Sequence, residues 1–458
     1  MTDISAVRNP KMAGGTAQAD FLGHPPALPY LFATEMWERF SFYGMRALLV
    51  LYMVKYAFQP DTAGTVIGLA PLRHGLEALF GPLDIQPLAS QVYGLYGGLV
   101  YLTPVLGGYL ADRVLGQRRT VIIGASLMAA GHFMMAIEPL LLFALALLIL
   151  GNGAFKPNMS AQVGGLYPPG DPRRDRAYSI FYVGINLGAF LAPLVCGTLG
   201  ERAGWHYGFG AAGVGMLIGL ATYLYAYPKL PHHRPLAAPD KKPPAEWRAI
   251  AALLILFVPT SLFWAAYEQQ GNTVALWADE QTDRTINLLF WTAEIPTTWF
   301  QAFNPLMIFA LTPFVVALWA RQARRGSEPS TLTKMALGCF GCAAANMVMA
   351  AAALYAGPDK ASWLWLLAYF AIITLGELYL SPIGLSLVSK VAPVSHVAMM
   401  MGVWLATLFA GNFLAGYLGS LWSSMGKPAF FLMIAGIALA AGVAIWGLKR
   451  PLRTALGE

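Results

Sequence analysis

The chain has 458 residues, of which 57% are hydrophobic and only 12% are charged. Soluble globular domains carry about 25% charged residues, so this composition excludes an ordinary soluble protein and indicates a chain that crosses a lipid bilayer several times. The net charge of +7 does not indicate a nucleic-acid-binding protein, because the basic residues lie in short segments between the apolar ones. We therefore expect the lipid bilayer, and no nucleic acid, as a partner.

Twelve apolar segments, each long enough to cross a bilayer, follow one another along the chain. All are expected to be helices, because lipid offers no hydrogen-bond partner to open backbone. The segments are residues 28–57, 88–112, 119–138, 140–165, 174–199, 206–228, 247–279, 299–321, 333–356, 361–390, 395–425 and 428–449. Since their number is even, both termini are expected on the same side of the membrane.

The distribution of basic residues predicts how the chain is oriented in the membrane. With both termini in the cytoplasm, 21 of the 30 Lys and Arg residues lie on that side and six lie outside, which is the arrangement that the positive-inside rule favours. The six outside residues are Lys55, Arg73, Arg202, Arg284, Lys360 and Lys427. Of the outside segments, residues 63–80 are expected to form a short external or interfacial helix, and residues 279–298 are acidic.

A basic, Pro-rich stretch at residues 228–244 is the one clear linker, and it divides the segments six and six. This division is typical of a two-bundle secondary transporter with its substrate site between the halves. The expected parts are a cytoplasmic N-terminal tail (1–27), an N-terminal six-helix bundle (28–228), a cytoplasmic linker (229–246), a C-terminal six-helix bundle (247–449) and a cytoplasmic tail (450–458). No nucleotide-binding loop pattern is present, so an ion gradient is the expected source of energy.

The first apolar segment carries four charged side chains on one helical face, namely Glu35, Glu38, Arg39 and Arg46. One charge at the bilayer centre costs about 2.5–3.5 kcal/mol, so these groups must pair and must face a protein interior or a watery cavity. Two interpretations follow. The cluster is either a structural set of ion pairs that fixes helix packing, or a face that binds a substrate and relays protons.

The same stretch, EMWERFSFYG at residues 35–44, resembles the ExxERFxYYG motif of the proton-dependent oligopeptide transporter (POT/PTR) family of the major facilitator superfamily. Six further matches to the family follow in order along almost the whole chain. They are YLTPVLGGYLADR (101–113), GNGAFKPNMS (151–160), FYVGINLG (181–188), FWAAYEQ (263–269), FNP (303–305) and GELYLSPIGLS (376–386).

The resemblance implies an all-α polytopic membrane protein with twelve transmembrane helices in two six-helix bundles, the major facilitator fold. Many bacterial members insert two extra helices between the halves, and the short polar linker predicts that this chain lacks them. Two residues depart from the family pattern. Phe42 replaces the first Tyr of YYG, and Gly94 stands where some members carry a His.

The function that the resemblance implies is a proton-coupled symporter that imports di- and tripeptides by alternating access. By resemblance, Arg39 and Lys156 attract the peptide carboxylate and Glu377 takes the α-ammonium, so that cations on one bundle and an anion on the other recognise both ends of a zwitterion. The other implied peptide-binding residues are Tyr43, Tyr101, Asn186, Trp264, Asn304 and Trp404. For Tyr101, Trp264 and Trp404, and also for Tyr182, ordinary packing is the alternative.

The charged residues inside the apolar segments do not balance. Four carboxylates face three cations, so one carboxylate must be neutral or hydrated at each stage, which is what a proton carrier requires. By resemblance, Glu268 and Arg46 face each other on the external side and link proton binding to gating, and Glu35 and Glu38 share or relay the proton. The alternative is that Glu268 and Arg46 form only a static strut. The seven charged residues inside the apolar segments are Glu35, Glu38, Glu268, Glu377, Arg39, Arg46 and Lys156.

Asp112 and Arg113 fall in the cytoplasmic loop after the second segment, where the resembled superfamily holds the cytoplasmic face in one state. Positive-inside topology is the alternative for the arginines of this loop, although it explains Asp112 poorly. Packing or interfacial solvation is the expected role of His132 and His396.

No metal, cofactor or enzymatic activity is expected. Cys339 and Cys342 form a CxxC pattern without His or carboxylates nearby, which favours small buried hydrophobic residues over a metal site. No nucleophile–base pair is evident. Two other functions stay open, namely the same fold with nitrate, another zwitterion or a peptide-like drug as cargo, and a receptor or scaffold without transport. The expected setting is a monomer in a bacterial inner (cytoplasmic) membrane.

Overall fold

In a computed structural model of the chain, the described residues are 23–168, 171, 173–230, 247–288, 291–391 and 397–456. Most of the expected N-terminal tail and linker, and His396, lie outside them. The described part is almost entirely helical, as the composition predicts, with four short strands that the sequence analysis did not predict.

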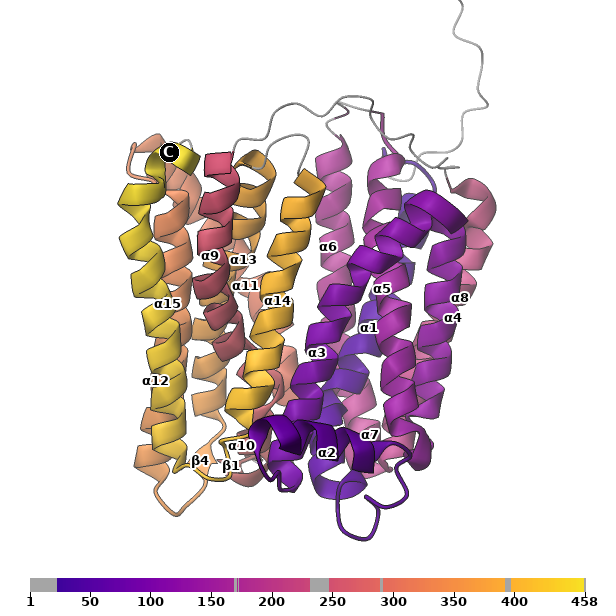
Figure 1. The fold of residues 1–458 in the computed structure, drawn as a ribbon, viewed down its shortest axis with the longest axis vertical. Helices are drawn as coiled ribbons and strands as arrows, with labels where there is room; N and C mark the ends of the chain where they lie inside the picture. Colours follow the sequence, from indigo (N-terminus) through magenta and orange to yellow (C-terminus); the bar gives the residue numbers. More distant parts are fainter. Residues whose placement is uncertain are drawn as a thin grey trace, which may run out of the picture.

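The described residues of the first half form six long helices and two short ones, which Figure 1 shows in indigo to magenta. A π-helical turn, Met53–Ala57, continues α1, and another, Ala111–Leu115, follows α3. A third π-helical turn, Pro193–Gly197, joins α6 to α7. The helices are α1 (Leu28–Tyr52), α2 (Leu69–Phe80), α3 (Ile85–Leu110), α4 (Gln117–Met134), α5 (Leu141–Gly165), α6 (Arg173–Ala192), α7 (Thr198–Arg202) and α8 (Trp205–Ala226).

The second half repeats the count of six long helices, with one short helix and a β-hairpin between the first two. Strand β2 (Thr285–Leu288) pairs antiparallel with β3 (Trp291–Glu294), while β1 (Thr282–Asp283) pairs parallel with β4 (Ala361–Ser362). The helices are α9 (Trp247–Tyr267), α10 (Thr273–Glu280), α11 (Phe303–Arg324), α12 (Thr331–Ala356), α13 (Leu364–Val391), α14 (Val397–Gly419) and α15 (Lys427–Leu456); short 3₁₀ turns, Glu268–Gly271 and Thr297–Ala302, precede α10 and α11.

By length and composition, nine helical segments of the described residues are apolar enough to cross a membrane. The long helices α1, α3 and α4 are not among the nine. Four charged residues lie in α1, and α4 starts with Arg118 and Arg119, which lower the mean hydropathy of these helices. In the described part, the twelve long helices begin within a few residues of the expected segments, and eight of them also end there. Helices α6 and α9 end seven and twelve residues before the expected ends, and further helical turns, together with α7 and α10, continue these two segments. The C-terminal ends of α14 and α15 lie six residues before and seven beyond those expected.

The two halves stand side by side, with α3 of the first half against α14 of the second and α6 against α11 (Figure 1). Glycines bring α3 and α14 into backbone contact. A Cβ atom added to Gly94 would lie 2.6 Å from the Cα atom of Gly416. No side chain fits at position 94 in this arrangement, so the Gly that replaces the family's His serves close helix packing.

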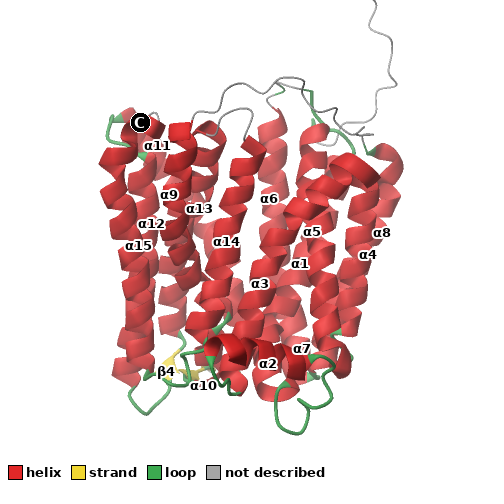
Figure 2. Cartoon of the chain, in the orientation of Figure 1, coloured by secondary structure: helices red, strands yellow, loops and turns green. Residues whose placement is uncertain are grey.

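The expected external helix within residues 63–80 is present as α2, which crosses the lower end of the molecule in Figure 2. Its last residue, Phe80, packs against Phe413 and Tyr417 of α14, with ring centroids 6.2 and 5.6 Å apart. On its exposed side, a hydrogen bond from Arg73 lowers the pKa of the Glu77 carboxyl. The helix therefore connects the first half to the second at this end.

Candidate functional site

A cavity of about 370 Å³ lies between the two halves. Side chains from both halves line it, and they include every residue that the sequence analysis assigned to peptide binding. These are Arg39, Tyr43, Tyr101, Lys156 and Asn186 from the first half, and Trp264, Asn304, Glu377 and Trp404 from the second. Glu35, Arg46, Tyr182 and Glu268 also line the cavity, whereas Glu38 does not.

Arg39 lies against both carboxylates at the start of the α1 motif. Arg39 donates to both oxygens of Glu38, with Nη2 to Oε1 at 2.7 Å, and its Nε lies 3.4 Å from Oε1 of Glu35. Asn152 donates to Glu38 at 3.3 Å, and Glu38 is completely buried. The second oxygen of Glu35 is buried and has no hydrogen-bond partner among the residues that the structure describes. Arg39 therefore reaches the cavity already paired.

Lys156 is the cation of the cavity that has no carboxylate partner. Its Nζ lies 4.6 Å from the centroid of the Tyr101 ring, and no carboxylate of the described residues lies within 4.0 Å of it. The aromatic face compensates part of its charge. An ammonium group held this way on a cavity wall is available to an anion.

Glu377, on the second half, is a cavity carboxylate without a cation partner among the described residues. Its Oε2 accepts hydrogen bonds from the Tyr267 hydroxyl at 2.6 Å and from Asn304 Nδ2 at 2.9 Å, and no cation of the described part lies within 4.0 Å. Asn304 also donates to Thr374 at 3.0 Å. A carboxylate with only neutral donors around it is available to a cation.

Arg46 and Glu268 form an ion pair that joins α1 to the end of α9. Arg46 also donates from Nε to the hydroxyl of Tyr93 on α3, at 2.8 Å. Glu268 is 3% exposed. The structure thus brings together the two residues that the resemblance paired.

The aromatic residues Trp264, Trp404 and Tyr182 of the cavity differ in how far they are buried. Trp264 and Trp404 are buried, and Trp404 lies over Gly384 of α13, where a Cβ atom would collide with its ring. Tyr182, by contrast, is 46% exposed and lines the cavity, which excludes a core position for it. Its carbonyl accepts a hydrogen bond from Asn186 at 3.0 Å.

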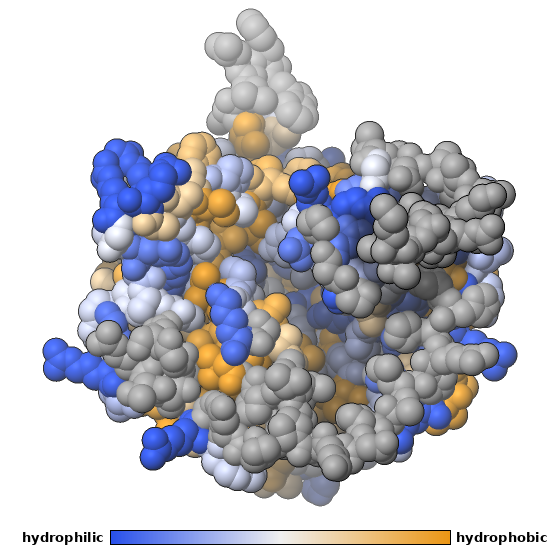
Figure 3. Space-filling model, turned by 90° about the horizontal axis from the view of Figure 1, so that it is seen from above, coloured by the Kyte–Doolittle hydropathy of each residue, from blue (hydrophilic) through white to orange (hydrophobic). Residues whose placement is uncertain are grey.

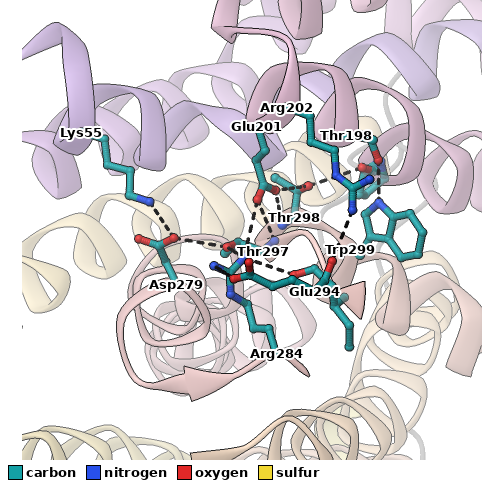
Figure 4. Close-up of polar contacts among 12 residues, drawn as sticks. Lys55, Thr198, Glu201, Arg202, Asp279, Arg284, Glu294, Thr297, Thr298 and Trp299 are labelled. Carbon is teal, nitrogen blue, oxygen red and sulfur yellow. Dashed lines mark hydrogen bonds and ion pairs between the residues drawn. The ribbon is translucent and has the colours of Figure 1, made fainter. Parts of the chain in front are cut away.

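The cavity is closed at one end. Near α2, α7 and α10 the two halves are held together by Arg46–Glu268 and by the contacts in Figure 4. Towards the other end, Tyr182 and Leu385 of the lining are exposed. Figure 3 looks onto that end, where hydrophilic side chains surround apolar ones. The cavity therefore opens towards the end of the molecule at which α15 terminates (Figure 1).

A polar network outside the cavity links the closed ends of the two halves (Figure 4). Glu201 of α7 accepts hydrogen bonds from the backbone N–H groups of Thr297 and Thr298, both at 2.8 Å, and from the Thr298 hydroxyl at 2.6 Å. Those N–H groups begin the 3₁₀ turn that leads into α11, so a carboxylate from the first half caps a helix of the second.

Further contacts surround this cap. Lys55 pairs with Asp279 at 2.6 Å, and Trp299 donates to Thr198 at 2.7 Å, both across the two halves. Arg284 pairs with Glu294 at 2.6 Å within the second half.

Asp112 and Arg113 lie on the π-helical turn after α3, both exposed. Among the described residues neither forms an ion pair. Their expected gating role stays a prediction. The described part also holds no group of three or more His, Cys, Asp or Glu residues that could bind a metal.

Sequence reasoning missed two residues of functional interest. Tyr267 lines the cavity and contacts Glu377, and it lies directly before Glu268 in the matched FWAAYEQ stretch, which was the available signal. Glu201 lies at the end of an apolar segment, and its partners are 96 and 97 residues away. No local pattern predicts that contact.

Comparisons with known proteins show the family of the chain. A family model described as the POT family matches residues 118–240 and 234–433. The chain is 32% identical to a di-/tripeptide transporter of Lactococcus lactis subsp. cremoris, over 96% of this chain and 98% of that protein. It is 35% identical to the peptide transporter YePEPT of Yersinia enterocolitica, over 87% of this chain and 88% of that protein.

Solved structures of POT family transporters are also similar to this chain. The crystal structure of a peptide transporter POT in complex with sulfate matches with a TM-score of 0.83 at 32% identity, covering 96% of this chain and 97% of that one. A POT family transporter in complex with 5-aminolevulinic acid matches with a TM-score of 0.82 at 27% identity, covering 95% and 98%. The chain is an integral membrane protein and not an enzyme, and it belongs to the POT family of transporters.

Proposed function

We propose that the protein is a proton-coupled symporter that imports di- and tripeptides by alternating access. The observation that carries the proposal is the pair of available charges in one cavity. Among the described residues, no carboxylate lies within 4.0 Å of Lys156 on the first half, and no cation lies within 4.0 Å of Glu377 on the second. A short peptide zwitterion supplies the missing partner to each. The di-/tripeptide transporter of Lactococcus lactis supports this cargo.

In the proposed topology, twelve transmembrane helices form two bundles, residues 28–228 and 247–449, without an extra helix pair. The linker (229–246) and both tails (1–27 and 450–458) are cytoplasmic. The closed end with the Glu201 network is then external, and the cavity opens to the cytoplasm. The distribution of basic residues supports this orientation, and the bacterial relatives support an inner membrane. The functional unit is a monomer.

The peptide carboxylate is held by Lys156, with Arg39 and Tyr43 beside it, and the α-ammonium is held by Glu377. Arg39 is already paired with two carboxylates, so Lys156 carries most of the attraction. Asn186 and Asn304 face the peptide from opposite halves, and Tyr101, Trp264 and Trp404 bound the space for side chains. This arrangement selects cargo by the distance between two charged ends.

The proton is carried by Glu268. When the external end is closed, Arg46 keeps this carboxylate ionised, and when the ends separate, the carboxylate loses its partner in a poorly hydrated site and takes up a proton. Reclosure returns Arg46 and releases the proton towards the cytoplasm. Glu35, with its unpartnered buried oxygen, and Glu38 are the groups that share or relay the proton. Asp112 and Arg113 act on the cytoplasmic side.

The direct test is uptake of labelled dialanine into proteoliposomes, with and without an imposed proton gradient. Accumulation that requires the gradient is expected. Absence of both uptake and competition by unlabelled peptides would remove the proposal.

Replacement of Glu377 by Gln should weaken dialanine binding about tenfold or more, because a hydrogen bond between charged groups contributes about 1.5–3 kcal/mol. The variant keeps the shape of the side chain and loses its charge. Binding of N-acetylated dialanine, which has no ammonium group, should change little. Competition against labelled dialanine measures both constants, and an unchanged dialanine constant would rule out the role of Glu377.

Replacement of Glu201 by Gln should shift the protein towards the outward-open state, because one amide oxygen cannot accept three hydrogen bonds as a carboxylate does. Spin labels at the exposed positions 61 and 359, on the external ends of the two halves, should report a new population at longer distance. Glu294→Gln is the matched control: its side chain is exposed, and such pairs contribute little. Equal distance distributions in Glu201→Gln and the control would contradict the prediction.

A second candidate cargo keeps the fold and the coupling. One solved relative is in complex with 5-aminolevulinic acid, which carries an amine and a carboxylate without a peptide bond. The two available charges of the cavity suit such a compound also, whereas nitrate would use only Lys156. A peptide-like drug would use both charges. Competition by 5-aminolevulinic acid that exceeds competition by dialanine would favour this alternative.

A further inference from the structure

We infer that Tyr267 is a positioning residue of the peptide site, whose hydroxyl aims the Glu377 carboxylate at the ammonium group of the cargo. The inference rests on the proposed function and adds a residue that neither the sequence motifs nor the relatives' names assign. Tyr267 is the last residue of α9, is 6% exposed and lines the cavity.

The two hydrogen bonds to Glu377 converge on one of its oxygens. Tyr267 Oη and Asn304 Nδ2 both donate to Oε2, at 2.6 and 2.9 Å. Among the described residues Oε1 accepts no hydrogen bond, and it is not one of the buried unpartnered atoms, so it meets the cavity. The terminal torsion of a glutamate is otherwise soft. Two donors on one oxygen fix that torsion and leave the other oxygen to accept from an ammonium group.

Tyr267 is itself held in place by neighbouring rings. It stacks on Phe263 with centroids 5.7 Å apart, and it meets the edge of Trp264 at 5.4 Å and 90°. Asn304 is fixed by its second hydrogen bond to Thr374. Both donors are therefore in position before cargo arrives, and no ordering of Glu377 is needed when it binds.

Substitution of Tyr267 by Phe removes the hydroxyl and keeps the ring packing. The inhibition constant of dialanine should rise about tenfold, as for loss of a hydrogen bond to a charged group. The constant of N-acetylated dialanine and the maximal exchange rate should stay within about twofold of wild type, and the ratio of the two constants is independent of the amount of folded protein. Tyr369→Phe is the matched control, since that hydroxyl is buried and has no hydrogen-bond partner in the described part of the chain, and it should change neither constant.

The double variant decides between positioning and general destabilisation. If Tyr267 acts through the charge of Glu377, then Tyr267→Phe should have little further effect in a Glu377→Gln background. The inference is overturned if Tyr267→Phe weakens free and N-acetylated dialanine equally, or if its effect adds in full to that of Glu377→Gln. Failure of the proposed function is distinct: the wild-type protein would then bind free and N-acetylated dialanine alike.

Discussion

A Glu268→Gln variant should lose all accumulation of dialanine driven by a proton gradient, yet should still exchange labelled for unlabelled dialanine without a gradient. Glutamine imitates a permanently protonated acid, so the ion pair with Arg46 that joins α1 to α9 is lost and no proton can be released. Proteoliposome uptake with an inward proton gradient, followed by counterflow at equal pH, measures the two activities.

Asp279→Asn is the matched control for this variant. Asp279 also pairs with a cation of the other half, but its partner Lys55 is 47% exposed, so accumulation should persist. Accumulation by Glu268→Gln against the peptide gradient would place the proton carrier elsewhere, at Glu35 or Glu38. Loss of exchange as well as accumulation would favour the static strut.

A Lys156→Ala variant should abolish concentrative uptake, because it removes the one cavity cation without a carboxylate partner among the described residues. In the wild-type protein, C-terminally amidated dialanine should compete poorly, since it offers no carboxylate. Uptake of labelled dialanine and competition by both forms are the measurements.

Lys334→Ala provides a control in a similar environment. Lys334 is also a buried lysine over an aromatic ring, 4.5 Å from the centroid of Trp319, but it pairs with Glu328 and does not line the cavity. Uptake by this variant should remain. Equal competition by free and amidated dialanine would contradict the assignment of Lys156.

The sequence predicted the helices well because the bilayer leaves few alternatives to them. Residues 28–57, expected as one segment, are helical throughout, including the π-helical turn. The cost of a charge in the bilayer also predicted that the charges of α1 must pair. Glu35 and Arg39 can do so because they are four residues apart on a helix. All the peptide-site residues except Trp404 came from matched motifs, and the structure places all of them, Trp404 included, on one cavity.

The features that the sequence did not predict depend on contacts between residues that are far apart in the chain. The sequence did not predict that Arg39 pairs with two carboxylates while Lys156 pairs with none of the described residues, because spacing alone does not determine which cation each carboxylate contacts. The β2–β3 hairpin was missed although Ile286 and Leu288 alternate with polar residues, because the segment was interpreted only as an acidic loop. The Glu201 cap was missed because neither of the helices that it joins carries a local signal for the other.

The contact of Gly94 with Gly416 has a consequence for the motion of the two halves. Where backbone meets backbone, with no side chain interleaved, α3 and α14 can roll on each other without any rotamer change at that point. If the two halves move about this contact, the interactions that must break lie at the closed end, in the Arg46–Glu268 pair and the Glu201 cap.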